Sequence, residues 1–547
     1  MNRREVMVEP RHPDQVMRLA RLGSAHPMRL SFLRILLRRM RREGWRFDRP
    51  VWQVDARGVG RAVYRARGPG RTYCLVAFAH DLPEEMRTDR VIATAWDATF
   101  ALVDGEPTAD DLDRLERNVP LQEAGRISRK ELSLSRANHS VRLFRHVVDS
   151  LAAGRQPDAA QIDAVGYLMR TTAVYGSGKF GAADRFEIAD RPELQAPFQA
   201  EMLSVWLTRA FTVDLAEQLA AAKGGPQAVR LDRGLRRRLG VGNSTGLGLA
   251  PFLIRHPALL NNWIAAREAA LARVRAKPDA SPAEIAALGA ALAEAQANAA
   301  LWQSEHPVQQ AKLTDLRADL AALGDHLETG WAQEPRPWDA LWRWGEGLSL
   351  EGQEALLALL LEPHGDLVDD LEDSLAADED AAFAIDGTMT LVQVSALLDR
   401  DYGWTRAWDF TRDEATARFW YVSQEKAEPR LGHRHTEEGA GREQPLDTAR
   451  AVQALRRDLD GADPSVTVGA FLRARPEHRH TLRRVQIAAG HPYAEIRDNL
   501  IGHDLLPIDI LRCKLAFFGA TRFDPRSDLW VRISLFQNEP YPDEMQP

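Results

Sequence analysis

The sequence predicts an α+β protein that is predominantly α-helical, with a small N-terminal antiparallel sheet unit, a large helical core and a mixed C-terminal unit. Strand-like segments rich in Val, Tyr, Trp, Phe and Thr fill about the first 105 residues, and short glycine turns separate them. Such turns favour antiparallel pairing, because a parallel crossover needs a dozen or more residues. Apolar residues at helical spacing then continue for about 300 residues. A strand-like stretch, DLWVRISLF, returns near the C-terminus.

The chain length sets the expected number of domains. A protein of 547 residues typically contains about three or four domains. We place an α+β unit with an antiparallel sheet in residues 1–110, a helical core with glycine-rich loops and an Ala-rich hairpin in 111–430, and a mixed unit in 431–547. The second boundary falls in the polar segment 424–447, whose glycines predict a loop.

Composition and charge argue against several classes of protein. A net charge of −7 gives no general attraction to nucleic acid. Two cysteines, Cys74 and Cys513, are too few for a disulfide framework or a Cys-rich zinc site, and they suit a reducing cytoplasm. The N-terminus lacks the apolar stretch of a secretion signal, and no uncharged apolar run approaches the ~18 residues of a membrane span. We therefore expect a soluble, cytoplasmic protein with no nucleic-acid or membrane partner.

The N-terminal unit opens with a predicted helix over 28–43, MRLSFLRILLRRMRRE, whose leucines and arginines lie on opposite faces. Basic amphipathic helices also bind membrane surfaces, but packing on an adjacent sheet is favoured because strand-like segments follow at once. Those segments span residues 50–58, 60–68, 71–82 and 90–106. Asp97, in the last of them, is either a hydrogen-bonded strand residue or a group that faces a cleft.

The helical core is expected to begin at PTADDLDRLERNV and to include SRANHSVRLFRHVVDSLAAG, which ends in a glycine suited to a helix C-terminus. Within that segment His139 is either a core or surface residue of a helix or a functional group. The apolar stretch 193–225 predicts a helix that Gly-Gly closes. Ser281 and Glu284 match a capping box, and the Ala-rich region 258–329 predicts a long helical hairpin that serves as scaffold or as a homo-oligomer contact.

Two glycine-rich stretches, AVYGSGKFG and GVGNSTGLGLA, carry the strongest functional signals. Gly242, Gly246 and Gly248 have a spacing similar to the cofactor loop of short-chain dehydrogenases, which also pair Tyr-x-x-x-Lys as in Tyr175 and Lys179. We reject this resemblance, because the pair precedes the loop and the segment before the loop, VRLDRGLRRRLG, does not predict a strand. A phosphate-binding P-loop is also excluded, because its first glycine and its Ser or Thr after the lysine are missing.

With both resemblances excluded, the residues of the two stretches still predict an anion-binding pocket. Glycines let a ligand approach the backbone, and a helix that begins after the Asn-Ser-Thr triplet would present unpaired N–H groups to a carboxylate or phosphate. The predicted catalytic residues are Lys179, Tyr175, Ser177 and His256. The predicted substrate-binding residues are Gly176, Gly178, Asn243, Ser244, Thr245, Gly246, Arg238 and Arg255, with Glu425 and Arg430 from a charged segment that follows three aromatic residues.

The sequence therefore favours an enzyme that acts on a small anionic substrate by acid–base chemistry, of lyase, isomerase or transferase type and without a metal. This prediction requires that the two glycine-rich loops meet in space. One alternative is a non-catalytic helical interaction or scaffold protein, in which those loops only pack helices. Another is a helical redox enzyme that holds flavin or a similar cofactor among its 14 tryptophans. The sequence does not identify a cofactor.

Overall fold

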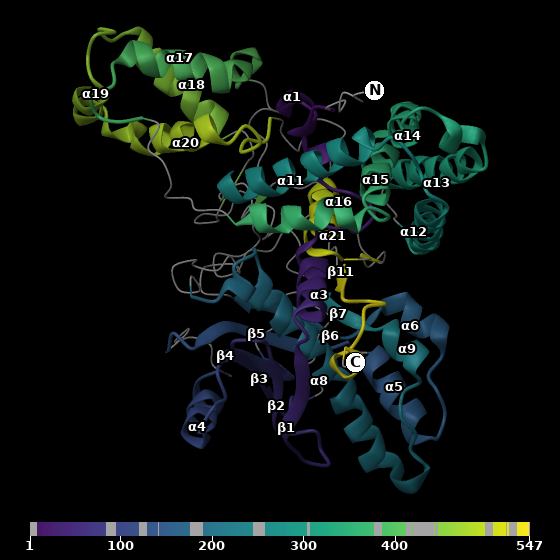
Figure 1. The fold of residues 1–547 in the computed structure, drawn as a ribbon. Helices are drawn as coiled ribbons and strands as arrows, with labels where there is room; N and C mark the ends of the chain where they lie inside the picture. Colours follow the sequence, from purple (N-terminus) through teal and green to yellow (C-terminus); the bar gives the residue numbers. More distant parts are fainter. Residues whose placement is uncertain are drawn as a thin grey trace. The chain divides into compact units, whose positions relative to one another are not determined.

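The computed structural model describes residues 8–83, 95–119, 128–140, 142–175, 190–243, 257–303, 307–376, 385–411, 419–420, 442–443, 447–497, 507–520, 522–523 and 533–545. Helices dominate and a nine-stranded mixed sheet accompanies them, so the helix-rich α+β class is confirmed (Figure 1). The chain divides into two compact units. The sheet unit comprises Arg29–Gly246 and Lys514–Pro547, and the helical unit comprises Met1–Met28 and Leu247–Cys513. Within the described ranges, no helix has the length and apolar character needed to cross a membrane.

The sheet takes strands from both sides of residue 110. Its order is β1-β2-β3-β4-β5-β6-β7-β11-β10, antiparallel throughout except for the parallel pair β6–β7. The strands are β1 (Arg46–Val54), β2 (Gly60–Arg67), β3 (Thr72–Ala79), β4 (Ala98–Asp104), β5 (Glu131–His139), β6 (Tyr167–Tyr175), β7 (Gly240–Asn243), β10 (Arg522–Phe523) and β11 (Ile533–Leu535). The antiparallel pairing predicted for the first four strands is confirmed. The late strand is also present, as β11 in the described part of DLWVRISLF.

The prediction of a helix over SRANH is wrong, because these residues belong to β5. The segment ELSLS alternates leucine and serine with the period of two that is typical of a strand. The apolar pattern of the helix that follows, α5 (Leu143–Ala152), obscured that alternation. β6 and β7 likewise interrupt the stretch that was expected to stay helical.

A long apolar helix, α8 (Gln199–Gly224), is the core of the sheet unit. It packs against β3 to β7 and against α3 (Phe32–Arg42) and α5. A helix that is apolar all round requires burial on every side, and Trp206 and Phe211 are both fully buried. The predicted helix over 28–43 and the Gly-Gly closure of α8 are confirmed. The remaining helices of this unit are α4 (Ala109–Asn118), α6 (Ala159–Val165), α9 (Arg233–Arg237), η3 (Pro192–Leu194), η4 (Gly225–Gln227) and η10 (Pro542–Glu544).

The helical unit contains the Ala-rich region. Its antiparallel hairpin is α12 (Pro282–Leu301) with α13 (Pro307–Leu327), since Gln296 bonds the Leu320 carbonyl and Arg317 bonds that of Ala299. The capping box of Ser281 and Glu284 is confirmed. Other elements are α1 (Pro13–Val16), α2 (Leu19–Leu22), α11 (Pro257–Ala276), α14 (Pro337–Gly345), α15 (Leu350–Leu360), α16 (Gly365–Val368), η5 (Gly330–Gln333), η6 (Asp369–Leu375) and the strand pair β8 (Phe419–Trp420) and β9 (Arg442–Glu443). Helix α21 (Pro507–Phe518) contains the boundary between the units.

Buried ion pairs hold the N-terminal segment to the rest of the helical unit. Arg11 donates to both carboxylate oxygens of Glu268, at 2.7 and 2.9 Å, and to Glu354 at 3.1 Å. Glu268 is 0% exposed and Glu354 is 1% exposed. Arg267 also contacts Glu268, at 2.8 Å, and donates to the carbonyl of Arg21. Each charge in this cluster therefore faces an opposite charge, which buried ions require.

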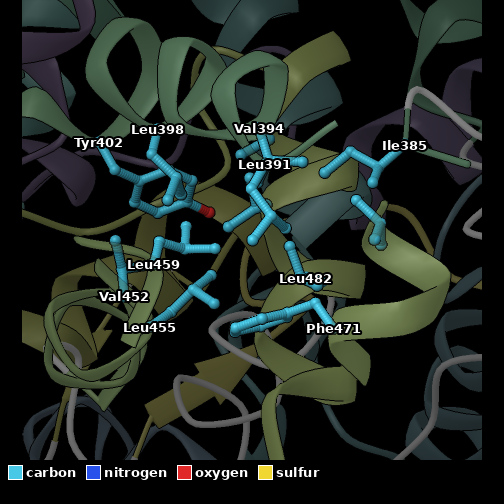
Figure 2. Close-up of a cluster of buried hydrophobic side chains, with 13 residues drawn as sticks. Ile385, Leu391, Val394, Leu398, Tyr402, Val452, Leu455, Leu459, Phe471 and Leu482 are labelled. Atoms are coloured by element: carbon cyan, nitrogen blue, oxygen red, sulfur yellow. The ribbon is translucent and has the colours of Figure 1, made fainter. Parts of the chain in front are cut away.

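Four further helices of the helical unit share a small apolar core. They are α17 (Leu391–Tyr402), α18 (Asp447–Asp460), α19 (Val468–Ala474) and α20 (Arg479–Gly490), and η7 (Gly403–Ala407) and η9 (Pro476–His478) accompany them. Figure 2 shows side chains of these helices converging on one cluster, with Tyr402 at one end and Ile385 at the other. The loops before α17 and α19 are joined by a bridge between Thr390 and Thr467. This core fixes the segment around Tyr402.

Candidate active site in the sheet unit

Neighbouring strand ends bring polar side chains to one edge of the sheet. Ala98 at the start of β4 pairs with Ala79 at the end of β3 and with Ala137 near the end of β5. His80 directly follows Ala79, and Asp97 directly precedes Ala98. The His80 N–H donates to the Asp97 carbonyl at 2.9 Å. Because adjacent antiparallel strands run in opposite directions, the end of one lies beside the start of the next. The register therefore gathers His80, Asp97 and the last residues of β5.

Asp97 is the buried acid of this edge, with 1% of its surface exposed. One carboxylate oxygen, Oδ2, accepts a hydrogen bond of 2.9 Å from the backbone N–H of His139. The other, Oδ1, lies 3.4 Å from Nδ1 of the His139 ring. The backbone N–H of Asp97 donates to Oδ1 of Asn138 at 2.8 Å. Backbone and side-chain groups together fix the carboxylate beside the imidazole.

The plane of the His139 ring is also fixed. The ring stacks on Phe144 of α5, with 3.7 Å between centroids and 11° between planes. Next to it, Ser140 Oγ accepts a hydrogen bond from the Phe144 N–H at 3.1 Å, which ties the end of β5 to the first turn of α5. A carboxylate beside one ring nitrogen orients an imidazole and selects its tautomer. The stacking on Phe144 and the Asp97 carboxylate therefore hold the His139 imidazole in one orientation.

A second imidazole, His80, lies at the same edge. Its Nε2 is 2.9 Å from Oγ1 of Thr99. Burial lowers the pKa of His80 below its usual value of 6.5, and the opposing effects of Asp97 and Glu116 are smaller. His80 is therefore uncharged near pH 7, where it serves as a neutral hydrogen-bonding group.

These side chains line a cavity of about 480 Å³. Its charged wall residues are Arg57, Arg145, Lys223, Asp81 and Asp97. Arg57 pairs with Asp81, and Lys223 pairs with Asp149 at 2.8 Å. The apolar part of the wall comes from α5 and α8 and includes Phe144, Val148, Leu215 and Leu219. A small molecule in this cavity meets an imidazole with its carboxylate, cationic groups and an apolar side.

The two glycine-rich loops begin from neighbouring strands. β6 and β7 run parallel, and Thr171 pairs with Asn243 at the end of β7. The segment before the second loop, VRLDRGLRRRLG, contains the short helix α9 and no strand over 229–239, as predicted, whereas the first residues of the glycine-rich stretch form the strand β7. β7 has four residues, two of them glycine, so its propensity is weak, and pairing with β6 and β11 determines it. The carboxyl ends of adjacent parallel strands are a common place for ligands.

The structure describes only a few of the residues predicted for the anion pocket. Tyr175 ends β6 and Asn243 ends β7, and the structure describes the backbone of both but not their side chains. The following predicted residues lie outside the described ranges: Gly176, Ser177, Gly178, Lys179, Ser244, Thr245, Gly246, Arg255, His256, Glu425 and Arg430. Their roles stay predictions.

Arg238 has a carboxylate partner. Its Nη1 donates to Oδ2 of Asp163 at 2.9 Å. The preceding arginines are also paired, Arg236 with Asp543 and Arg237 with Glu544, at 2.7 and 2.9 Å. In the structure these arginines hold α6 and the C-terminal segment rather than forming a cationic patch.

His139 and the start of the first glycine-rich loop lie toward opposite ends of β5. On β5, Leu134 pairs with Tyr175, and His139 pairs with Met169. Five residues of β5 separate these two positions, which is about 17 Å at ~3.4 Å per residue. His139 lies at one end of the strand and the loop after Tyr175 starts near the other.

One group of metal-ligand types occurs in the described part of the helical unit: Asp458, Glu477 and His478. His478 Nε2 lies 2.7 Å from Asp458 Oδ2. Arg475 lies within 4 Å of both carboxylates, 3.4 Å from Asp458 and 3.8 Å from Glu477. The arginine already balances much of their charge, so we interpret the group as a structural ion-pair cluster.

Sequence reasoning noted Asp97 and His139 one at a time and missed His80, Arg57, Arg145 and Lys223. The signal that could have found the site is the recurrence of a polar residue just outside successive strands, as with His80 and Asp97. Comparison with protein-family models, with curated proteins and with solved structures finds no match for this chain. The chemistry of the cavity therefore rests on its own geometry.

Proposed function

We propose that the sheet unit is an enzyme that transfers protons on a small anionic substrate, as a lyase, isomerase or transferase, with His139 as the proton-exchanging group. The observation that carries this proposal is the buried Asp97 carboxylate 3.4 Å from Nδ1 of a stacked imidazole in the cavity wall. A carboxylate in this place stabilises the imidazolium form, so the ring takes up a proton from one atom and returns it to another.

The size and charge of the cavity support a small anion. About 480 Å³ falls within the range of roughly 300–1,000 Å³ that small-molecule sites occupy. Arg57, Arg145 and Lys223 place guanidinium and ammonium groups in the wall. Asp81 and Asp149 already pair with Arg57 and Lys223, so an anionic group would bind by sharing these cations, and the Leu215 and Leu219 side would contact the carbon skeleton.

Thermal unfolding of the full chain against phosphate, small dicarboxylates, nucleotides and coenzyme A tests the proposal. A ligand at ~100 times its dissociation constant adds roughly 2.7 kcal/mol when it binds only the folded protein. We expect at least one anion to raise Tm, and His139→Gln and Asp97→Asn to reduce that shift. Once turnover is measured, both variants should lose about 100-fold or more in kcat.

His480→Gln is the matched control, since His480 is an exposed histidine on α20 in the other unit. It should leave both the shift and the turnover unchanged. The proposal is wrong if no anion of the panel raises Tm, or if His139→Gln responds to the bound anion as the native protein does.

A second candidate is the anion pocket of the two glycine-rich loops, with Lys179 and Tyr175 as acid–base groups. The parallel pairing of β6 and β7 favours it, because both loops then leave neighbouring strands in the same direction. Lys179→Ala separates the candidates. If Lys179→Ala loses the anion-induced rise in Tm and His139→Gln keeps it, the anion binds at the loops. If His139→Gln loses the rise and Lys179→Ala keeps it, the anion binds in the cavity.

A further inference from the structure

The helical unit contains a second cavity, of about 760 Å³, which the proposed function does not use. Three separate segments form its wall: the N-terminal segment around Arg18, the turn after α17 with Trp404 and Trp408, and the segment that ends at Arg497. The cavity is large enough for a nucleotide-sized molecule. Its wall differs from that of the first cavity in containing two indoles, those of Trp404 and Trp408.

The wall contains hydrogen-bond donors without acceptors. Among the residues that the structure describes, the buried Nε of Arg497 and the buried Nε1 of Trp404 have no hydrogen-bond partner. Arg497 is 9% exposed. Its Nη1 pairs with the Asp14 carboxylate, whereas its Nε has no acceptor. A buried donor without an acceptor is costly to the folded protein. A bound oxygen acceptor would remove that cost.

Neighbouring contacts hold both donors in position. Arg497 lies over the Trp404 ring, 5.5 Å from its centroid. Trp404 in turn stacks on Tyr402, with 6.4 Å between centroids and 28° between planes. The Tyr402 hydroxyl donates to Glu495 at 2.9 Å, and Glu495 also accepts from Arg484 at 2.6 Å. Tyr402 belongs to the small apolar core, where its hydroxyl end is visible (Figure 2).

The charges in the wall favour an anion. Each carboxylate has a cationic partner: Asp14 has Arg497, Asp401 has Arg400, and Glu495 has Arg484. Arg18 instead donates to backbone carbonyls, those of Asp14 and Arg497. Its positive charge therefore has no carboxylate in direct contact among the described residues of this wall.

We propose that this cavity binds a small molecule that combines a planar ring with an anionic oxygen group. The indole of Trp404 or Trp408 provides the flat surface for the ring. The N–H of Trp404 and Nε of Arg497 provide the donors, and Arg18 provides the unmatched charge. An aromatic carboxylate and a nucleoside monophosphate share this chemistry.

Titration calorimetry of the full chain with adenosine monophosphate, benzoate, adenosine and inorganic phosphate tests the proposal. We expect adenosine monophosphate or benzoate to bind with a sub-millimolar Kd. The more tightly bound of the two shows whether the cavity prefers a phosphate or a carboxylate as the anionic group. Adenosine lacks the anionic group and inorganic phosphate lacks the ring, so both should bind at least tenfold more weakly.

Trp404→Phe keeps an aromatic ring and removes only the N–H donor, and Arg497→Gln removes the buried cation. Each should weaken binding at least tenfold. Trp344→Phe is the control, because Trp344 stacks on His326 away from this wall and its loss should not change Kd. Circular dichroism confirms that each variant is folded. No binding of either ringed anion, equal binding of phosphate, or binding unchanged in both Trp404→Phe and Arg497→Gln would overturn the proposal.

Discussion

The two cavities differ in what holds their polar groups in place. In the sheet unit, Asp97 accepts the backbone N–H of His139, and the register of β3, β4 and β5 sets both positions. In the helical unit, backbone contacts place Trp404 in η7 and tie the Arg497 N–H to the Met17 carbonyl, but the Trp404 ring and the Arg497 guanidinium group are oriented by contacts between side chains, including those with Tyr402 and Asp14. Backbone hydrogen bonds between strands still hold a residue in place after one side chain is replaced. Where contacts between side chains hold a residue, replacing one of them changes its position. We therefore expect the helical unit to be more sensitive to the loss of single charges.

The largest expected effect tests this difference at Arg11, which anchors the segment that leads to Arg18. Arg11→Met leaves the buried carboxylates of Glu268 and Glu354 without one of their cations. Removing one partner of a buried ion pair costs about 3–5 kcal/mol. Chemical denaturation followed by tryptophan fluorescence should show this loss in the free energy of unfolding, since most tryptophans lie in the helical unit.

Arg406→Met is the matched control, because Arg406 forms an exposed pair with Asp399. Exposed pairs contribute about 0–1 kcal/mol, so this variant should unfold nearly as the native protein does. A loss below about 1 kcal/mol in Arg11→Met would contradict the view that buried charges hold the N-terminal segment.

The sheet unit also contains charged clusters, and Glu544 is the centre of one that joins α9 to the C-terminal segment. Burial acts to raise the pKa of Glu544, but hydrogen bonds from the Tyr541 N–H, Arg233 and Arg237 outweigh it and hold the pKa at about 2, against an ordinary 4.5. A carboxyl with a lowered folded pKa stabilises the protein above the unfolded pKa. That contribution is lost as the pH falls from about 4.5 toward about 2.

Glu544→Gln should therefore lower the free energy of unfolding at pH 7 by about 1.5–3 kcal/mol, the usual worth of hydrogen bonds to a charged group. It should also flatten the pH dependence of stability between about pH 4.5 and 2. Denaturation across this pH range, compared with the native chain, measures both effects. An unchanged slope would show that the cluster does not depend on the charge of Glu544.

Local signals predicted the parts of the fold that depend on short sequence ranges. The capping box of Ser281, the Gly-Gly closure of α8 and the first four strands are of this kind. β7 could not be predicted, because four residues of GVGN become a strand only by pairing with β6 and β11, which are distant in sequence. Long-range pairing of this kind leaves little local trace.

The candidate site shows the same limit. Asp97 and His139 each drew notice as polar residues in apolar surroundings, but their pairing depends on the register of β4 and β5 across 42 residues of sequence. The assignment of His139 to a helix removed that register from consideration. The anion pocket was predicted from glycines, an expected helix start and nearby charged residues, on the premise that the two loops meet in space. The structure shows that the strands before the loops are adjacent and does not describe the loops.

The smallest expected effect tests how closely the cavity wall of the sheet unit is packed. The last turns of α8 line the cavity, and a Cβ on Gly224 would overlap the carbonyl oxygen of Ala152 at the end of α5. Gly224→Ala should therefore lower the free energy of unfolding by about 1–3 kcal/mol, although alanine is the better helix former. Thermal and chemical denaturation measure the change.

Gly289→Ala separates packing from helix propensity. Gly289 lies within α12 of the helical unit, and a Cβ there would meet nothing within 4 Å. The same substitution should raise stability by roughly 0.5–1 kcal/mol, because only the propensity term remains. Opposite signs at the two glycines would show that α8 is closely packed against α5 while the outer face of α12 is open. If Gly224→Ala instead stabilised the protein, α8 and α5 would have room to separate, and the cavity wall would be adjustable.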